Sequence, residues 1–417
     1  MQIKNILSNL QSNNKSYQLL KKTKGYFIIA LFFWSVYGKA QNNSLQANIE
    51  FSVYKGTVKG QFTSFACEKV LAPNTLEKNA IDKPGDFKIE VLVKSRMVKQ
   101  LFFSSLASEW AEMCSDDSCK LQQFSESFRL DLPHSLFSVR LKKRIAATGK
   151  WVILDSASIN PTQLTVIKPI NYSVKKISQP SKKPKKLTIA FIPDGYGLDS
   201  ISYLSDCKRF TSEFFNTTPF NLFKQNIAIN ALFFPTDTSS ICTFKTLGIP
   251  RYLSVNKRDE LAKRVAGIHA DQLVVIYKSD QYGGSGFYNN YAVVSSSNKW
   301  SIKVFLHEFG HSFGGLGDEY VTDTAFCVVP NNGIDCAYPN VSSMPNGKVK
   351  WARLIKKSTP IPTPILPEYK NEVGVYEGAS YCPHELYRPF QNCLMRELTP
   401  GIFCPVCKEA IIKRLTK

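Results

Sequence analysis

The sequence predicts a multidomain α+β protein in which a β-sandwich-like domain precedes a mixed α/β domain. Residues 41–172 consist of short β-like runs between glycine and proline turns, and they lack a strong helical period. After residue 187, buried-type strands alternate with helical segments. A lysine- and proline-rich stretch, 173–186, separates these two parts and predicts a linker. With 417 residues, 43% hydrophobic and 21% charged, the chain is long enough for two folded domains.

The first forty residues have the pattern of a secretory signal peptide. Lysines precede an apolar run over residues 27–36, and the small residue Ala40 stands before Gln41. We expect cleavage near Ala40 and export to the periplasm, the cell surface or the medium. The alternative is a retained anchor, but the run is shorter than the roughly 20 residues that span a bilayer. We therefore expect no membrane span in the mature chain.

The amino-terminal half contains five runs that predict strands. Each is rich in β-branched or aromatic residues and is followed by a turn. The runs cover residues 48–54, 87–93, 100–103, 137–142 and 150–154. Short strands without a strong helical signal between them favour two packed antiparallel sheets, so we expect a β-sandwich over residues 41–172.

Basic residues dominate the net charge, and part of the excess lies in the predicted linker. The chain carries +20, which falls to +14 once residues 1–40, with six lysines and no acidic residue, are removed. Six more lysines lie within residues 175–186. Docking to an anionic surface or a nucleic acid is one interpretation. Because the run lacks aromatic residues for base stacking and the chain is expected to be exported, we favour a solvated linker and no nucleic-acid partner.

The carboxyl-terminal half, residues 187–417, begins with alternating strands and helices. Strands are expected at residues 187–192, 227–233 and 272–277, and helices at residues 200–215 and 258–265. A glycine-rich segment then leads into residues 291–295, which alternate like a strand. An edge strand at 291–295 would suit backbone pairing with an extended peptide, and an ordinary hairpin within the sheet is the alternative.

The most specific feature of the chain is the segment His307-Glu-Phe-Gly-His311. On a helix, His307 and His311 project from one face and can bind one metal ion, and Glu308 can reach a water in the fourth position. Zn²⁺ lowers the pKa of such a water, and a nearby carboxylate can accept its proton. Residues 300–306 are mostly apolar, and Gly314-Gly315 predicts the end of the helix. The motif therefore favours a zinc hydrolase over two histidines on an ordinary solvated helix.

Eleven cysteines in a chain expected to be exported predict disulfides, and the odd number leaves at least one thiol unpaired. Cys327 with Cys336, and Cys114 with Cys119, would each close a short loop. Residues 404–407 form a C-x-x-C motif, but the βαβ context of a redox enzyme is missing. The alternative to disulfides near the carboxyl terminus is a second zinc site. Its ligands would be Cys382, Cys393, Cys404 and Cys407.

The segment around the histidines resembles the metal motif of the M64 family of secreted metallopeptidases, named for a bacterial immunoglobulin A peptidase. Residues 306–320 read L-H-E-F-G-H-S-F-G-G-L-G-D-E-Y. Residues 191–196 resemble the opening strand of the family's catalytic domain. The C-terminal signature is similar to residues 373–381, 387–389, 392–396 and 403–407. The family's preceding β-rich domain resembles residues 108–110, 124–129 and 141–144, so the resemblance covers most of residues 45–417.

The resemblance implies a zincin-type, metzincin-like catalytic domain with one catalytic Zn²⁺. It implies that His307 and His311 are metal ligands and that Glu308 is the general base. Metzincins have their third ligand ten residues after the first, but a glycine occupies that position here. We therefore expect Asp318 as the third ligand, because it is the nearest carboxylate after the turn and resembles the acidic position of the M64 motif. The alternatives are Glu319 and His384.

The resemblance also implies roles for residues near the carboxyl terminus. Met395 is expected at a methionine turn beneath the metal, although a buried methionine is usually only part of a core. Tyr387 or Arg388 is expected to stabilise the oxyanion that develops during hydrolysis. For Arg388, an ion pair with Glu377 is the alternative.

The sequence thus predicts an exported zinc endopeptidase that acts on a protein or peptide substrate. Two alternatives stay open. One is an exported binding or adhesion protein whose peptidase domain is silent, and the other is a zinc hydrolase of a non-peptide acyl bond.

Overall fold

The computed structural model describes residues 42–54, 57–70, 84–113, 120–321, 327–399 and 401–416. The chain divides into two compact units, Met1–Gln41 and Asn42–Lys417. The predicted signal peptide belongs to the first unit and lies outside the described residues. Among the residues that are described, no helix is long and apolar enough to cross a membrane.

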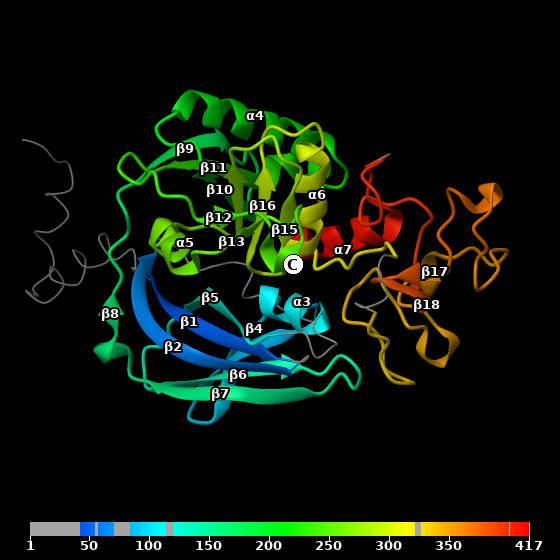
Figure 1. Ribbon diagram of the computed structural model, residues 1–417, viewed down its shortest axis with the longest axis horizontal. Helices are drawn as coiled ribbons and strands as arrows, with labels where there is room; N and C mark the ends of the chain where they lie inside the picture. The colour runs from blue at the N-terminus through cyan, green and yellow to red at the C-terminus, as the bar shows by residue number, and fades with distance from the viewer. Residues whose placement is uncertain are drawn as a thin grey trace, which may run out of the picture. The chain divides into compact units, whose positions relative to one another are not determined.

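Two four-stranded sheets form the amino-terminal part of the second unit (Figure 1). One has the order β5-β1-β2-β8 and the other the order β4-β3-β6-β7. The strands are β1 (Asn42–Tyr54), β2 (Thr57–Val70), β3 (Phe87–Val93), β4 (Arg96–Phe103), β5 (Gln122–Asp131), β6 (Phe137–Arg144), β7 (Trp151–Ile159) and β8 (Thr165–Val166). Helix α3 (Leu106–Met113) follows β4.

The facing sides of these two sheets share one hydrophobic core. Along β1, every second residue from Leu45 to Val53 is completely buried, as the two-residue period of a strand requires. Phe51 of the first sheet contacts Phe87 of the second, with ring centroids 4.6 Å apart. The sheets therefore bury their apolar faces against each other.

A six-stranded sheet, of order β15-β16-β14-β10-β11-β9, forms the centre of the carboxyl-terminal part. Its four central strands are parallel, and the two outer strands run antiparallel to their neighbours. The parallel strands are β10 (Leu187–Asp194), β11 (Ile227–Phe233), β14 (Gln272–Tyr277) and β16 (Tyr291–Ser295). The outer strands are β9 (Ser173–Ser178) and β15 (Gly284–Gly286).

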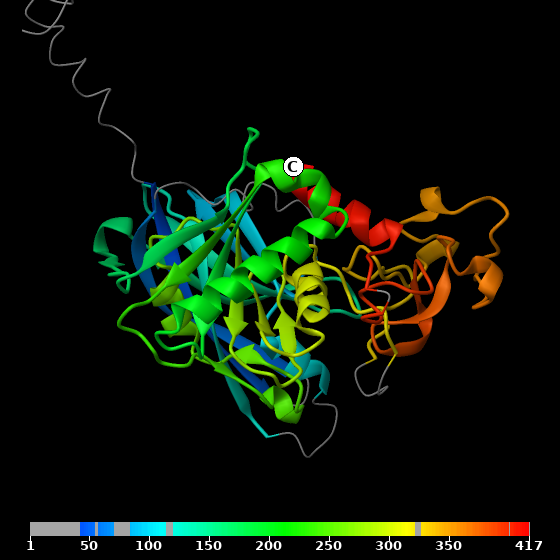
Figure 2. The ribbon, with the colours of Figure 1, turned by 90° about the horizontal axis from the view of Figure 1, so that it is seen from above.

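Both faces of the six-stranded sheet are covered. Helices α4 (Ser200–Asn216) and α6 (Ser301–Ser312) pack on one face, and Figure 2 shows α4 running across the strands. Helix α5 (Arg258–Val265) and the pair β12 (Cys242–Thr243) and β13 (Ser254–Val255) pack on the other face. Burial on both faces explains why the central strands read as continuous apolar runs in the sequence.

The remaining elements follow α6 or are short. Strands β17 (Tyr376–Ala379) and β18 (Cys382–Arg388) form an antiparallel pair, and α7 (Pro405–Thr416) is the last helix. In the described part of the chain, the 3-10 helices are η4 (Pro161–Gln163), η5 (Phe220–Asn226), η6 (Thr246–Gly248), η8 (Pro345–Gly347), η9 (Ala352–Leu354) and η10 (Pro367–Tyr369).

Buried charged residues join the amino-terminal sheets to α5. Arg129 on β5 pairs with Glu68 on β2, and its guanidinium also donates to the backbone carbonyl groups of Val265, the last residue of α5, and of Ile268. Glu126 on β5 pairs with Arg258 of α5, with Nε and Oε2 2.9 Å apart. Because Glu126 and Arg258 are both almost fully buried, this contact fixes α5 against the amino-terminal part.

One sequence prediction is wrong at the edge of the six-stranded sheet, and one pair of alternatives is decided there. Residues 173–178, expected to begin a linker, form β9 and pair with β11. Of the two alternatives for residues 291–295, the structure shows the hairpin within the sheet: β16 pairs antiparallel with β15, lies between β14 and β15, and is buried. Because both of its edges are already paired, β16 cannot pair with a peptide substrate.

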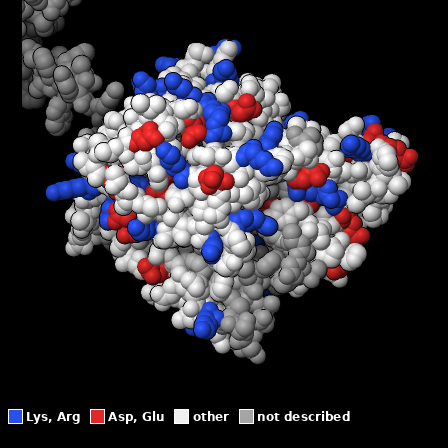
Figure 3. All heavy atoms as spheres, turned by 45° about the horizontal axis from the view of Figure 1, so that its top comes forward, with Lys and Arg blue, Asp and Glu red and all other residues white. Residues whose placement is uncertain are grey.

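The rest of the predicted linker is exposed to solvent, as expected for a lysine-rich run. Five of the six lysines within residues 173–186 are exposed, and Lys186 is half-buried beside Phe223. On the face shown in Figure 3, lysine and arginine side chains are dispersed among acidic ones rather than gathered in one stripe.

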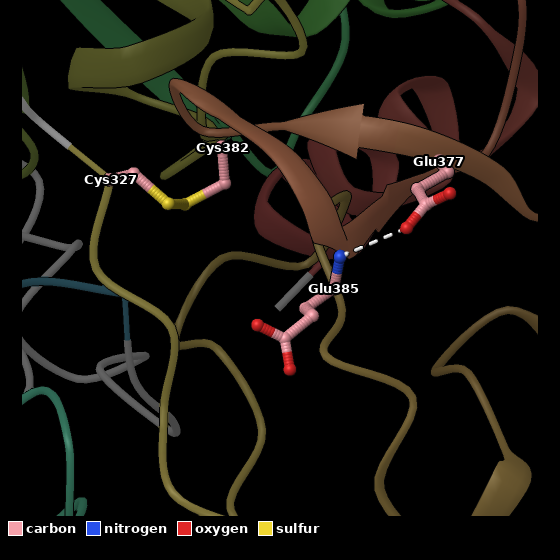
Figure 4. Close-up of a disulfide and its surroundings, with 4 residues drawn as sticks. All are labelled: Cys327, Glu377, Cys382 and Glu385. Atoms are coloured by element: carbon pink, nitrogen blue, oxygen red, sulfur yellow. Dashed lines mark hydrogen bonds between the residues drawn. A yellow bond between two sulfur atoms is a disulfide. The ribbon is translucent and has the colours of Figure 1, made fainter. Parts of the chain in front are cut away.

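One disulfide is present among the described cysteines, and it joins Cys327 to Cys382 at the start of β18 (Figure 4). The predicted pairing of Cys327 with Cys336 is therefore wrong. All three cysteines belong to one small hydrophobic cluster, and it is the β17–β18 hairpin that brings Cys382 to Cys327. Figure 4 also shows the backbone N–H of Glu385 donating to Glu377 across that hairpin.

The expectation that most cysteines form disulfides is also wrong for the described residues. Seven of them carry free thiols, namely Cys67, Cys207, Cys242, Cys336, Cys393, Cys404 and Cys407. Cys114 and Cys119, the other predicted pair, lie outside the described residues.

Candidate active site

Helix α6 carries His307, Glu308 and His311, and it ends as the sequence predicts. Gly315 adopts a left-handed backbone conformation with φ of 63°. Its N–H donates to the carbonyl of His311, and the N–H of Leu316 donates to the carbonyl of Gly310. A left-handed glycine whose N–H bonds to the carbonyl four residues earlier is typical of an αL helix end, which reverses the chain. Residues 316–318 consequently return toward the face that carries the histidines.

Each imidazole is oriented by a backbone carbonyl group. Nδ1 of His307 lies 2.8 Å from the carbonyl oxygen of Leu394, and Nδ1 of His311 lies 2.7 Å from that of Leu316. Because a carbonyl oxygen can only accept, Nδ1 carries the proton in both rings. The two Nε2 atoms are then left as acceptors, and they face each other at 3.0 Å.

Asp318 brings a third acceptor to the same point. Its Oδ1 lies 3.2 Å from Nε2 of both His307 and His311 and makes no hydrogen bond. The hydroxyl of Tyr381 donates to the other carboxylate oxygen at 2.9 Å, which orients the group. The three side chains are only 12–16% exposed.

The three acceptor atoms fit a zinc ion. With bonds of 2.0–2.2 Å and tetrahedral angles, ligand atoms lie about 3.3 Å apart, close to the separations between these atoms. Three acceptors that converge without a donor repel one another unless a cation or protons lie between them. Two imidazoles and one carboxylate are also ligands that zinc prefers in catalytic sites.

The charges of the three groups are strongly coupled. Burial opposes the ionised form of Asp318, but the two neighbouring imidazoles outweigh it and hold the pKa of Asp318 well below its usual range. Burial lowers the pKa of His311, whereas the Asp318 carboxylate raises it, with a net result of about 9. Without a metal, protons therefore occupy the positions that a metal would take.

Glu308 lies next to these groups and lines a cleft of about 460 Å³. Burial raises the pKa of Glu308, against the opposing effect of the two histidines. Gly284 and Gly286 of β15 pack against Glu308 so closely that a Cβ on Gly286 would lie 2.2 Å from the Glu308 carbonyl oxygen. The glycine-rich segment thus gives the sheet room to contact the helix at this residue.

Both halves of the second unit line the cleft. The amino-terminal part contributes residues on and around α3, including Ser105 and Glu109. Glu109 accepts a hydrogen bond from the hydroxyl of Tyr252, which lies beside β15. Three side chains that could hold a metal ion and a buried carboxyl group therefore lie in one cleft, which is large enough for part of a peptide.

The family model described as IgA peptidase M64 matches residues 176–371 and 365–415 of this chain. The chain belongs to the M64 family. No curated protein matches the sequence at a significant level. Membership in M64 implies a metallopeptidase with a protein or peptide substrate, and the expected resemblance is confirmed. The matched residues begin within β9 and include the whole six-stranded sheet except the first residues of β9.

Of the third ligands expected for an M64 peptidase, the structure brings Asp318 to the histidines. His384, on β18, is 77% exposed, and its Nδ1 lies 3.4 Å from Oε1 of Glu377. Glu319 is completely buried and turns to the other side of the chain, where its carboxylate meets cysteines rather than histidines. Successive residues of an extended segment point in opposite directions, which explains the separation.

Met395, expected at a methionine turn, packs against helix α6. It is completely buried, and its sulfur packs on Gly310, between the two histidines on α6. A Cβ on Gly310 would lie 2.7 Å from that sulfur. The preceding residue, Leu394, supplies the carbonyl that orients His307, so this turn supports the metal-binding face from below.

The expectation that Tyr387 or Arg388 stabilises the oxyanion is not supported, because neither residue lines the cleft among the described residues. Arg388 is buried, and its guanidinium donates to the backbone carbonyls of Glu377 and Gly378. Tyr387 pairs with Glu377 across the β17–β18 hairpin, and its side chain packs against the main hydrophobic core.

Four residues in the cleft escaped the sequence analysis: Arg251, Tyr282, Tyr320 and Tyr381. Burial raises the pKa of Tyr282, and so does the charge of Glu308, whereas Arg251 lowers it. Tyr282 and Arg251 line the same cleft as Glu308, and Gly284, two residues after Tyr282, packs against the Glu308 side chain. The sequence signal for Tyr282 was its position beside the glycine-rich segment. Tyr381 is 63 residues from Asp318 in the chain, and no sequence pattern indicated that the two would be in contact.

Asp318→Asn should lower the zinc content by one ion per chain after dialysis against a mild chelator, because a neutral amide is a poorer zinc ligand than a carboxylate. Asp280→Asn is the matched control, since Asp280 is exposed and outside the cleft. Retention of all zinc by Asp318→Asn, with loss from His384→Ala, would show that the third ligand is misassigned.

Proposed function

We propose that this M64 chain is an exported, zinc-dependent endopeptidase. The observation that supports it best is the convergence of three acceptors from His307, His311 and Asp318 beside the buried carboxyl group of Glu308. That arrangement provides a metal-binding position and a proton acceptor within one cleft. Family membership favours a peptide bond as the one that is hydrolysed.

His307, His311 and Asp318 would hold one catalytic Zn²⁺, which when bound polarises the scissile carbonyl and acidifies a water. Glu308 accepts the proton of the attacking water and then donates it to the nitrogen of the leaving amine. Its raised pKa suits both steps, because a carboxyl group that is too acidic would not return the proton. Leu394 and Leu316 keep the imidazoles in the tautomer that leaves Nε2 free for the metal.

We further propose a β-sandwich-like domain followed by a zincin-type, metzincin-like catalytic domain, which the sequence analysis placed at residues 187–417. The helix with two histidines, the return of the chain at Gly315 and Met395 beneath Gly310 support the catalytic domain. The core shared by two four-stranded sheets supports the β-sandwich-like domain. Because β9 belongs to the central sheet, the catalytic domain would start near residue 173 rather than 187.

Replacement of Glu308 by Gln should lower kcat by roughly 10²–10⁴-fold on a casein or peptide substrate while zinc content stays unchanged, because the base is lost and the ligands remain. Glu385→Gln, at an exposed carboxylate on β18, should keep wild-type activity and serves as the control. A Glu308→Gln enzyme that turns over at the wild-type rate would exclude this mechanism. A wild-type protein that cleaves acylated small molecules but no peptide would favour the alternative acyl hydrolase.

We assign the donor to the developing oxyanion to Tyr282, because its side chain lines the same cleft as Glu308 and the three candidate metal ligands. Tyr282→Phe should then lower kcat on the order of 10²-fold with little change in KM. Tyr387→Phe should leave kcat unchanged, because that hydroxyl lies outside the cleft. Steady-state kinetics of both variants on one peptide distinguish the two tyrosines. The opposite order of effects would restore Tyr387 to this role.

Export with cleavage near Ala40 rests on the sequence pattern of residues 1–40. Protein recovered from the medium or periplasm of the producing cells should have an intact mass that lacks those residues. Recovery of the full-length mass in the cytosolic fraction alone would contradict export.

A further inference from the structure

A second group of ligating side chains lies behind the candidate active site. Cys393, Cys404, Cys407 and Glu319 bring their thiols and carboxylate within 4.8 Å of one another. All four side chains are completely or almost completely buried. A zinc site of four cysteines was the alternative to disulfides in the sequence analysis, but Cys382 is in the disulfide with Cys327, and Glu319 lies beside the other three cysteines instead.

From this arrangement we infer that Glu319, Cys393, Cys404 and Cys407 form a structural zinc site. It is separate from the candidate catalytic site and would have no open position for substrate. The inference concerns a second metal and does not depend on the proposed peptidase activity.

The separations between ligand atoms agree with a four-coordinate zinc ion. With Zn–S bonds of about 2.3 Å and tetrahedral angles, two thiolate sulfurs lie about 3.8 Å apart and a sulfur and a carboxylate oxygen about 3.5 Å. Here Sγ of Cys393 and Sγ of Cys407 are 3.7 Å apart, and Sγ of Cys407 is 3.3 Å from Oε1 of Glu319. A disulfide has a much shorter S–S distance, as in the pair Cys327–Cys382 at 1.97 Å.

The hydrogen bonding of the buried Glu319 carboxylate is independent evidence for a bound cation. Oε1 of Glu319 accepts a hydrogen bond from Nδ2 of Asn340 at 2.8 Å. Oε2 is buried and has no hydrogen-bond partner among the described residues. A carboxylate oxygen left unpaired in a dry interior is costly unless a cation or another donor satisfies it.

Backbone N–H groups around the sulfurs favour thiolates. The N–H of Cys404 donates to Sγ of Cys393 at 3.3 Å, and the N–H of Cys407 donates to Sγ of Cys404 at 3.4 Å. Cys404 immediately precedes Pro405, the first residue of α7, so its sulfur is near the positive end of a 12-residue helix. These features stabilise negative charge on sulfur, and thiolates are the form in which cysteine ligates zinc.

The charge of the site also has a buried counterpart. Three thiolates and one carboxylate around Zn²⁺ leave two negative charges. Arg388 is 2% exposed, and its positive charge acts on the Glu319 carboxyl group. Arg388 does not line the cleft, so the cleft does not explain its burial. The negative charge of the proposed zinc site does, because a buried guanidinium is stable only where negative charge compensates it.

A metal here would brace the candidate active site from behind. Glu319 follows Asp318 in the chain, and Cys393 precedes Leu394, whose carbonyl orients His307. The N–H of Glu319 donates to the carbonyl of Met395 at 2.8 Å, so the two segments already run side by side. One ion would tie both of them to the first turn of α7 through Cys404 and Cys407.

Counting metal in a variant without the catalytic ligands tests the site. Full-length mature protein should contain two zinc ions per chain, and His307→Ala/His311→Ala should retain one after dialysis against a mild chelator. Adding Cys404→Ser to that double variant should remove the remaining ion, whereas adding Cys336→Ser should not, because Cys336 is a free, half-buried thiol outside the cluster. Circular dichroism of each variant monitors folding.

Cobalt substitution identifies the ligands without measuring activity. The double variant loaded with Co²⁺ should show thiolate-to-metal charge-transfer absorption in the near ultraviolet, which histidine and carboxylate ligands do not produce. A folded double variant with no zinc and no such absorption would overturn the site. A disulfide between any two of Cys393, Cys404 and Cys407 in peptide maps of the unreduced protein would also overturn it. Loss of peptidase function in Glu308→Gln bears only on the proposed function.

Discussion

The reversal of the chain at Gly315 is the constraint on which the rest of the candidate site depends. A helix alone can present His307 and His311 on one face, but it cannot supply a third ligand from the same turn. The left-handed conformation of Gly315, three residues after the end of α6, sends the chain back. The return path then provides the Leu316 carbonyl for His311 and the Asp318 carboxylate for both rings.

The same return path divides two adjacent acidic residues between different chemical environments. Asp318 meets imidazoles at the edge of a solvent-connected cleft, where an exchangeable position for substrate is useful. Glu319 points into a dry interior beside thiols. The arrangement around Leu394 mirrors this division, since its own carbonyl serves His307 while the neighbouring Cys393 belongs to the sulfur-rich cluster.

Sequence reasoning predicted the elements whose pattern is local and continuous. The parallel strands and α4, α5 and α6 were found because burial on both faces, or on one helical stripe, leaves long apolar periods. Strand β2 was missed because half of its residues face solvent and its apolar positions are sparse. Cys382, Tyr381 and Arg388 were misassigned or missed because their partners are set by tertiary contacts. No spacing rule predicts which of several nearby cysteines a hairpin will bring together.

Close contacts around α6 limit which amino-acid substitutions this region can accept during evolution. A Cβ at Gly286 would collide with the main chain of Glu308, and one at Gly310 would collide with Met395. A clash with a flexible side chain can be relieved by a second substitution, but a clash with a carbonyl oxygen requires the helix itself to move. Gly286 therefore has almost no mutational freedom, whereas exposed residues at the mouth of the cleft can vary independently. Natural drift or directed evolution can thus alter specificity at the mouth of the cleft while leaving the position of α6 unchanged.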